Sequence, residues 1–292
     1  MTTLHLETAP PRTGGDPARR GFDWSLVLVY VIALVAVAIT AAPVLYVVLG
    51  GFRTTGQITN RPAALPDPWV FTNYTSVLGS STFWNQVRNS TLVALVTTAG
   101  VVLLGVMAAF VLARYEFRGR GAMYTFFTVG LLFPVTVAIL PLYLLLQDIG
   151  LLDSLWGVMI PQVAFALPMT IVILVPFLRA IPVELEDAAA IDGTSRIGFF
   201  WRIMLPLSGP GLITVGVLAF VGSWNAYLLP LLVLNDSESF TLPLGVQDFS
   251  TQYSQDTAMV LAFTSLAMVP ALLFFTLAER RIVGGLTGAV KG

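Results

Sequence analysis

The chain has 292 residues, of which 56% are hydrophobic and 11% charged, with a mean hydropathy of +0.83 and a formal net charge of −1. Soluble domains carry about 25% charged residues, so this composition excludes an ordinary soluble domain, a disordered chain and a basic surface for nucleic acid. The sequence has no cysteine, which excludes disulfides and thiolate chemistry.

Six stretches without a charged residue are each long enough to cross a bilayer, which takes about 20 apolar residues. In chain order they are 25–49, 89–113, 121–147, 154–178, 203–235 and 257–278. The fifth exceeds one span, and its helix is predicted at about 209–232. Because lipid tolerates no unpaired backbone groups, the sequence predicts an all-α integral membrane protein with six transmembrane helices. A tail at 1–24 precedes the membrane domain at 25–283, and a second tail follows at 284–292.

The distribution of basic residues predicts the orientation. Twelve of the fifteen lysines and arginines fall on the side of the two termini, and the other side holds Arg53, Arg61 and Arg88. The positive-inside rule then places both termini in the cytoplasm. The first stretch of 25 apolar residues is too long for the core of a signal peptide, which takes about 7–15, so it is interpreted as a span.

The loop between the fourth and fifth spans, at 179–206, is predicted to be cytoplasmic and structured. Pro182 suits the first turn of a helix, and the acidic residues that follow complement the positive end of its dipole. These acidic residues are Glu184, Glu186 and Asp187. Gly193 is suited to end the helix in the left-handed conformation.

A second short helix is predicted after Gly193. Thr194 or Ser195 is expected to cap it, and its apolar face is predicted to consist of Ile197, Phe200, Trp201 and Met204, ending at Pro206. The alternative is an amphipathic helix that rests on lipid. That alternative does not explain the acidic first helix, because an anionic leaflet repels acids.

This loop resembles the EAA loop of binding-protein-dependent ABC importer permeases. The family pattern is Glu-Ala-Ala, three residues, Gly, nine residues and Ile-x-Leu-Pro. The corresponding residues here are Asp187-Ala188-Ala189, Gly193 and Ile203-Met204-Leu205-Pro206, with Asp187 replacing the glutamate directly after Glu186. The resemblance implies a cytoplasmic coupling helix that docks on an ATPase through Glu186, Asp187, Ala188, Ala189 and Asp192, with Gly193 setting the bend.

Two further stretches resemble the carbohydrate-uptake, maltose-type branch of this family. The stretch 220–230, with Trp224, Asn225 and Tyr227, is similar to its fifth-span signature, and 283–292 is similar to the tail of its second permease. The resemblance implies the ABC importer type I permease fold in the plasma membrane of a bacterium. In that branch the tail lies between two ATPase subunits, which implies ATPase contacts for Thr287 and Lys291.

The same resemblance implies the partners. They are a homologous second permease, two ATPase subunits and an extracytoplasmic sugar-binding protein. A Walker A loop needs Gly-Lys-Ser/Thr, and the only lysine here, Lys291, precedes Gly292. ATP and Mg are therefore expected on partner subunits, with no cofactor, metal or catalytic residue in this chain. The implied function is a pore subunit that moves a di- or oligosaccharide inward.

The spans and outer loops suggest where a solute would pass. The spans contain no Asp, Glu, Lys, Arg or His, whereas a neutral, hydroxyl-rich solute needs amides and aromatic faces. Trp224, Asn225 and Tyr227 have that chemistry and are candidate pathway residues, although helix–helix hydrogen bonding and an interfacial aromatic belt are alternatives. The outer loop 235–256 is expected to touch the binding protein.

Three other functions are alternatives to the sugar importer. An importer for amino acids or polyamines would favour buried acids for a cationic cargo. A secondary carrier without an ATPase would need no EAA loop and typically places ionisable groups at depth. A membrane enzyme is disfavoured because the chain has no HExxH motif, no cysteine and one histidine, His5, in the polar tail.

Overall fold

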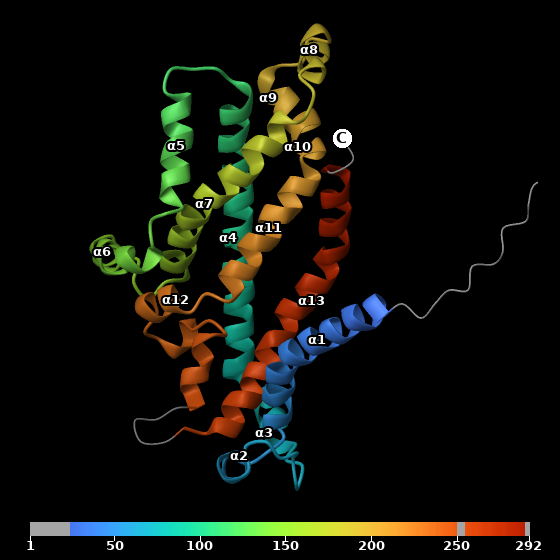
Figure 1. Cartoon of the computed structure of the whole chain (residues 1–292). Helices are drawn as coiled ribbons and strands as arrows, with labels where there is room; N and C mark the ends of the chain where they lie inside the picture. Colours follow the sequence, from blue (N-terminus) through green and yellow to red (C-terminus); the bar gives the residue numbers. More distant parts are fainter. Residues whose placement is uncertain (1–23, 250–254, 290–292) are drawn as a thin grey trace, which may run out of the picture. The chain divides into compact units, whose positions relative to one another are not determined.

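The computed structural model describes residues 24–249 and 255–289, with side chains placed at 26–249 and 255–276. All elements in these ranges are helical (Figure 1). The first eight are α1 (Trp24–Gly50), α2 (Thr55–Asn60), α3 (Thr72–Gly79), α4 (Ser81–Arg114), α5 (Arg120–Gly130), α6 (Val135–Asp148), α7 (Leu155–Arg179) and α8 (Glu184–Ile191). The others are α9 (Arg196–Phe199), η1 (Phe200–Met204), α10 (Leu205–Leu207), α11 (Gly209–Trp224), α12 (Leu228–Val233), η2 (Ser237–Ser239), η3 (Leu244–Phe249) and α13 (Thr257–Ala289).

The chain divides into two units, Met1–Tyr46 and Val47–Gly292. The described part of the first unit is most of α1, which is apolar around its whole circumference, as suits a helix in lipid. The second unit holds the other helices and the three hydrophobic cores.

Four helices of the described ranges are long and apolar enough to cross a membrane, and two bent pairs raise the number to six if each pair is one span. The four are α1, α4, α7 and the first part of α13, which match the predicted first, second, fourth and sixth spans. The bent pairs are α5 with α6, at 99°, and Arg196–Leu207 with α11, at 76°.

The predicted span over 121–147 is divided between two helices, because the chain turns between α5 and α6. Phe133 precedes Pro134, which disfavours the helical conformation for the residue before it and has no N–H to continue the ladder. The predicted continuous helix over 209–232 is wrong, since α11 ends at Trp224 and α12 starts at Leu228. Asn225 donates a side-chain hydrogen bond to Val221 O at 2.9 Å and so caps α11.

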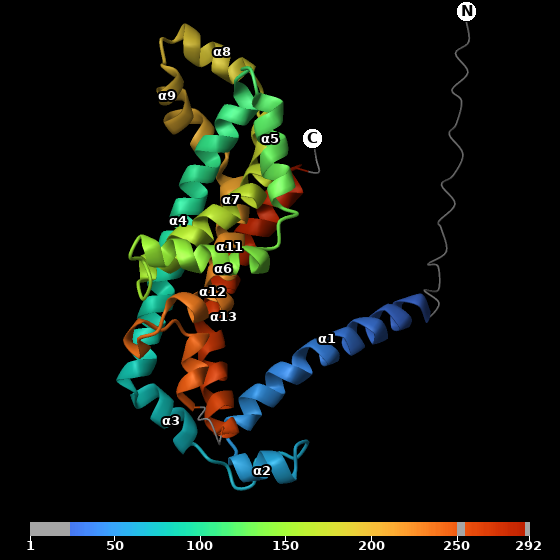
Figure 2. The same ribbon diagram turned by 90° about the vertical axis from the view of Figure 1, so that its left-hand side faces the viewer.

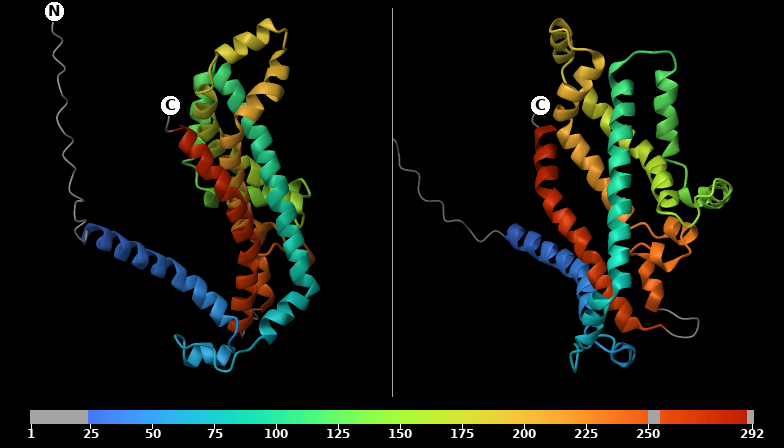
Figure 3. Two further views of the ribbon diagram at one scale, coloured as in Figure 1. Left: turned by 90° about the vertical axis from the view of Figure 1, so that its right-hand side faces the viewer. Right: turned by 180° about the vertical axis from the view of Figure 1, so that it is seen from behind.

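The central element of the second unit is α4, which runs along the whole unit (Figure 3, right). It packs most extensively against α7 and then α11, and α13 packs against α11. Residues of α4 enter all three hydrophobic cores. One end of the unit carries α8 and α9 and the other carries α2 and α3 (Figure 2), so α4 connects the two ends.

Candidate functional site

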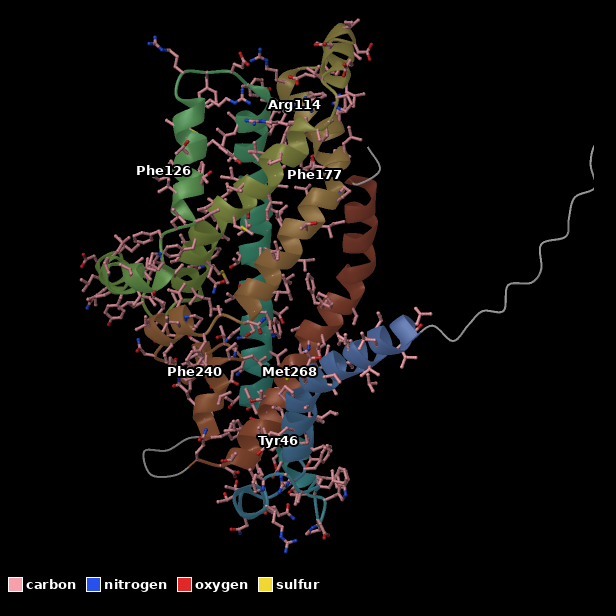
Figure 4. All side chains as sticks on the ribbon, viewed as in Figure 1. Tyr46, Arg114, Phe126, Phe177, Phe240 and Met268 are labelled. Carbon is pink, nitrogen blue, oxygen red and sulfur yellow. The ribbon has the colours of Figure 1, made fainter. Side chains whose placement is uncertain are left out.

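The loop after α7 is fastened to the end of α4. Arg114, the last residue of α4, donates from Nη2 to Ile181 O at 2.6 Å. Figure 4 places Arg114 at the end of the unit that carries α8. Helix α8 then begins at Glu184 with three acids in its first turn, as predicted, while Pro182 lies one residue before the N-cap, Val183.

The turn at Gly193 has the predicted conformation. Gly193 has φ 78°, its N–H donates to Ala190 O at 3.1 Å, and the N–H of Thr194 donates to Ala189 O at 2.9 Å. This pair of bonds is a Schellman motif, which satisfies the last carbonyls of α8 and requires a left-handed residue at its centre. Ser195 then caps α9 by accepting from Gly198 N at 3.2 Å.

Helix α8 has an inner and an outer face. Ala189 is 5% exposed and packs in the core that also contains Phe110, Phe199 and Phe200, so it faces its own subunit. Glu186 is half-buried. The exposed face contains Glu184, Asp187, Ala188 and Ile191, with Asp192 and Gly193 exposed beyond it.

Ile191 was not predicted as a site residue. Its side chain is 87% exposed on the outer face of α8, outside the membrane spans. The sequence signal was its helical register, since residues 184, 187, 188 and 191 share one face. Ile191 is therefore a candidate contact for a partner that covers this face of α8.

If this face docks on an ATPase, as the resemblance of the loop implies, replacing Ile191 with Glu should weaken ATPase retention without unfolding the chain. The side chain has almost no contacts to lose within this subunit, and burial of a large aliphatic side chain contributes about 1.5–3 kcal/mol. We expect the amount of co-purified ATPase to fall about tenfold in a competitive wash, measured by quantitative gel densitometry. Ile197→Glu, at another exposed isoleucine, is the matched control. Equal retention by Ile191→Glu and the wild type would contradict this contact.

The apolar face predicted for the second helix is wrong in part. Phe200 and Met204 are buried, at 5% and 0% exposure, whereas Ile197 and Trp201 are 73% and 47% exposed. The chain forms a π-helix at Phe200–Met204, whose wider turn changes the angular spacing on which the predicted face depended. Pro206 does not end the helix, since α10 continues to Leu207.

The break after α11 borders a cavity of about 370 Å³. Trp224 and Asn225 line it together with Thr264 and Met268 of α13 and with Leu242, Pro243 and Val246, and Figure 4 labels Met268 on α13. Trp224 is 4% exposed and donates from Nε1 to Ala267 O at 3.4 Å. Tyr227 does not line this cavity; it is 45% exposed, and its hydroxyl accepts from Gln247 Nε2 at 3.3 Å.

A second unpredicted residue, Asp153, joins the loop before α7 to the loop after α12. It has a left-handed φ of 55°, which aspartate tolerates better than most residues. Its Oδ1 accepts from the N–H groups of Asn235 and Asp236, both at 3.0 Å, and its own N–H donates to Val233 O at 2.7 Å. Hydrogen bonds from Asp236 and then Asn235 hold the pKa of Asp153 below its usual value, against a small opposing effect of burial.

The lowered pKa of Asp153 predicts a pH-dependent contribution to stability. Since the carboxylate is favoured in the folded state, the contribution is complete above the ordinary pKa of 3.8 and is lost as the pH falls below it. Asp153→Asn should lower the Tm by a few degrees at pH 7, and the difference should shrink as the pH falls below 3.8. Thermal melts of both proteins across that range test this, with Asp148→Asn as control. A difference that grows at low pH would contradict it.

The structure describes only some of the remaining predicted residues. Thr287 lies in α13, whose backbone is helical to Ala289, but its side chain lies outside the described residues, as does all of Lys291. Phe240 and Phe249 of the outer loop are half-buried, and Tyr253 lies outside the described residues. The described residues contain no cluster of three or more His, Cys, Asp or Glu side chains that could hold a metal.

The described residues form an all-α domain with several candidate membrane spans and a loop of two short helices, α8 and α9, at one end (Figure 2). The family model described as binding-protein-dependent transport system inner membrane component matches residues 101–282. The chain belongs to this family of ABC importer permeases. The family consists of the membrane-spanning subunits rather than the ATPases.

Relatives and solved structures agree with this assignment. The chain is 37% identical over 251 residues to the diacetylchitobiose uptake system permease protein NgcG of Streptomyces coelicolor, covering 85% of this chain and 83% of that protein. It is 33% identical over 278 residues to the trehalose transport system permease protein SugB of Mycobacterium tuberculosis, covering 94% and 99%. A subunit of a bacterial ABC transporter involved in the import of alginate has the same fold, with a TM-score of 0.76 at 20% identity over 93% of this chain and 99% of that chain.

Proposed function

We propose that this chain is a pore subunit of an ATP-driven importer that carries a di- or oligosaccharide into the cytoplasm. The observation that carries the proposal is the loop α8–α9, a rigid pair of helices held by a Schellman turn with an exposed face of acids and Ile191. Relatives named for diacetylchitobiose and trehalose uptake support a sugar as the cargo. An importer for another small polar solute is the second candidate.

The proposed assembly contains a second permease, two ATPase subunits and an extracytoplasmic sugar-binding protein, with ATP and Mg bound by the ATPases. The outer face of α8 docks on one ATPase through Glu184, Asp187 and Ile191, while Ala189 positions the helix from inside. Glu186, Asp192 and Gly193 complete the coupling loop. The tail residues Thr287 and Lys291 contact the ATPase pair. A solved alginate ABC transporter in complex with an alginate pentasaccharide-bound periplasmic protein supports the kind of outer partner.

The sugar is proposed to pass the break after α11, where Trp224 and Asn225 line the cavity. Irregular backbone at membrane depth is tolerated where it lines a cavity or is buried in protein, and this cavity offers an indole, an amide and the hydroxyl of Thr264. Tyr227 lies at the outer rim in this proposal. The outer loop 235–256 is proposed to touch the binding protein, which crosslinkers at Ser250 or Gln252 would capture.

The proposed orientation has both termini in the cytoplasm. It is supported by the twelve basic residues on the side of α8 and of the two termini. Reporter fusions at Gly15 and Thr287 should give a cytoplasmic signal, and a fusion at Ser250 an extracytoplasmic one. A cytoplasmic signal at Ser250 would overturn the orientation.

Co-purification tests the proposed assembly. The chain, tagged at its N-terminus and extracted from membranes in mild detergent, should bring down one second permease and two ATPase subunits per copy, measured by native mass spectrometry. A secondary carrier would purify without an ATPase. Recovery of the chain alone, still competent to move sugar without ATP, would overturn the proposal.

A further inference from the structure

The outer end of α4 holds the outer loop through a row of polar side chains. Asn89 Nδ2 donates to Glu238 O at 2.8 Å and Phe240 O at 3.1 Å, and Ser90 Oγ accepts from Leu242 N at 2.7 Å. Gln86 Nε2 donates to Asp248 Oδ2 at 2.7 Å, and Asn85 Nδ2 to Glu238 Oε2 at 3.0 Å. Gln86, Asn89 and Ser90 are at most 3% exposed, so breaking these bonds would leave buried polar groups unpaired.

The loop itself is packed onto α4 rather than free. Leu242 and Leu244 are fully buried. Gly245 lies so close to the helix that a Cβ there would overlap the Gln86 amide oxygen and come within 2.6 Å of Phe263 Cζ. The outer loop 237–249 and the start of α4 are therefore packed together as one structural unit.

The inner end of α4 contacts the coupling loop through Tyr115. The Arg196 guanidinium lies over the Tyr115 ring, 5.1 Å from its centroid, and the ring packs edge-on against Phe110 at 5.4 Å. Burial raises the pKa of Tyr115, the Glu186 carboxylate raises it further and Arg196 lowers it. Residues of α8 and α9 thus meet at the end of α4, beside the bond from Arg114 to Ile181.

Between these two ends, α4 is one continuous helix. It has 34 residues, or about 51 Å at the rise of an α-helix, and none of them is proline. By contrast, α1, α6, α7 and α13 each contain an interior proline, which removes a ladder bond and favours bending.

We propose that α4 joins the outer loop 237–249 and the coupling loop into one stiff body, and that this body relays the docking of the extracytoplasmic binding protein to the coupling helix. The inference rests on the proposed function, which supplies the partner at each end. Asn89 and Tyr115 are then positioning residues, since they act through the loops that they hold.

Weakening the contacts at either end of α4 should reduce the coupling between docking of the binding protein and ATP hydrolysis. In the whole complex reconstituted in nanodiscs, we expect Asn89→Leu and Tyr115→Leu each to lower ATP hydrolysis stimulated by the sugar-loaded binding protein by about fivefold or more. Hydrolysis without the binding protein and subunit stoichiometry should stay unchanged. Tyr115→Phe keeps the ring under Arg196 and should retain full stimulation, and Arg118→Gln, at an exposed arginine of the next loop, is the charge control. Full stimulation in both leucine variants would overturn the relay.

A crosslink between the outer loop and α4 should leave stimulated hydrolysis unchanged if the two move as one body. If the loop has to move relative to α4, the same crosslink should reduce it. The chain has no native cysteine, so Asn85→Cys with Glu238→Cys can be bridged by a short bis-methanethiosulfonate linker. We expect stimulated hydrolysis to survive the bridge. Its loss on bridging, with recovery on reduction, would mean that the loop moves relative to α4 and would overturn the inference.

The double variant Asn89→Leu/Tyr115→Leu tests whether the two ends belong to one path. If both ends belong to one path, stimulation in the double variant should fall no further than in the more impaired single variant, because a second substitution on the same path adds no independent loss. Losses that multiply would contradict a single relay. A wild-type complex that the binding protein does not stimulate would overturn the proposed function and this inference with it.

Discussion

Gly193→Val is expected to lower sugar uptake strongly while the chain still inserts into the membrane. A left-handed conformation costs an L-residue about 1–2 kcal/mol, and a β-branched residue resists it further. No heavy atom lies within 4 Å of a Cβ at this position, so the cost is purely one of backbone conformation. The Schellman turn should open and misplace α8, lowering ATP-dependent uptake by about tenfold or more, since 1.4 kcal/mol is a tenfold change in a population.

Gly119→Val is the matched control, because it introduces the same backbone strain outside the loop that contains α8. Gly119 also has a positive φ, 93°, and open surroundings, but it lies in the loop before α5. Gly119→Val should retain most uptake, and Gly193→Asn should too, because asparagine tolerates the left-handed region. Equal uptake and equal ATPase retention in Gly193→Val and the wild type would show that the bend has no part in coupling.

Gly157→Val is expected to destabilise the packing of α7 against the loop that precedes it. Gly157 is a buried residue in the first turn of α7, where a Cβ would overlap the carbonyl oxygen of Leu151 and lie 3.0 Å from Val233 Cγ1. A backbone carbonyl cannot move aside as a flexible side chain does, so the cost should reach the upper part of the overpacking range, about 3 kcal/mol. Thermal unfolding of the purified complex should show a Tm lower by about 6–12 °C.

Gly222→Val is the control for this second substitution. Gly222 is also a helical glycine, in α11, and a Cβ there meets nothing within 4 Å. It should cost only a small propensity difference, with a Tm near that of the wild type. A Tm for Gly157→Val that equals the control would mean that the contact between α7 and the Leu151 carbonyl is not maintained.

The first part of the loop 179–206, as far as the cap at Ser195, could be predicted in detail because its signals are local. The acids of the first turn, the glycine of the αL cap and the serine cap each act on residues three or four positions away, and the structure confirms α8, the turn at Gly193 and the cap at Ser195. The spans could also be predicted from local sequence, since each corresponds to a stretch without charged residues. The start of α4 at Ser81 was not, because a gap in charge marks the membrane and not the helix.

The errors arise where distant parts of the chain decide the structure. The accepting role of Asp153 depends on backbone groups 82 and 83 residues away, which no local pattern encodes. The inner position of Ala189 follows from packing against Phe199 and Phe200, although its neighbour Ala188 is exposed. The bends at Pro134 and Asn225 had local signals, but prolines inside α6, α7 and α13 show that a proline alone does not decide where a span breaks.

ATP-dependent accumulation of sugar tests the central claim most directly. The complex containing this chain is reconstituted in proteoliposomes with its ATPases facing enclosed ATP and the binding protein on the other side, and labelled diacetylchitobiose, trehalose and longer oligosaccharides are supplied together with arginine and spermidine as comparison cargoes. We expect one of the saccharides to accumulate only when both ATP and the binding protein are present, and arginine and spermidine not to accumulate. Accumulation driven by a proton gradient without ATP, or of arginine or spermidine in place of sugar, would contradict it.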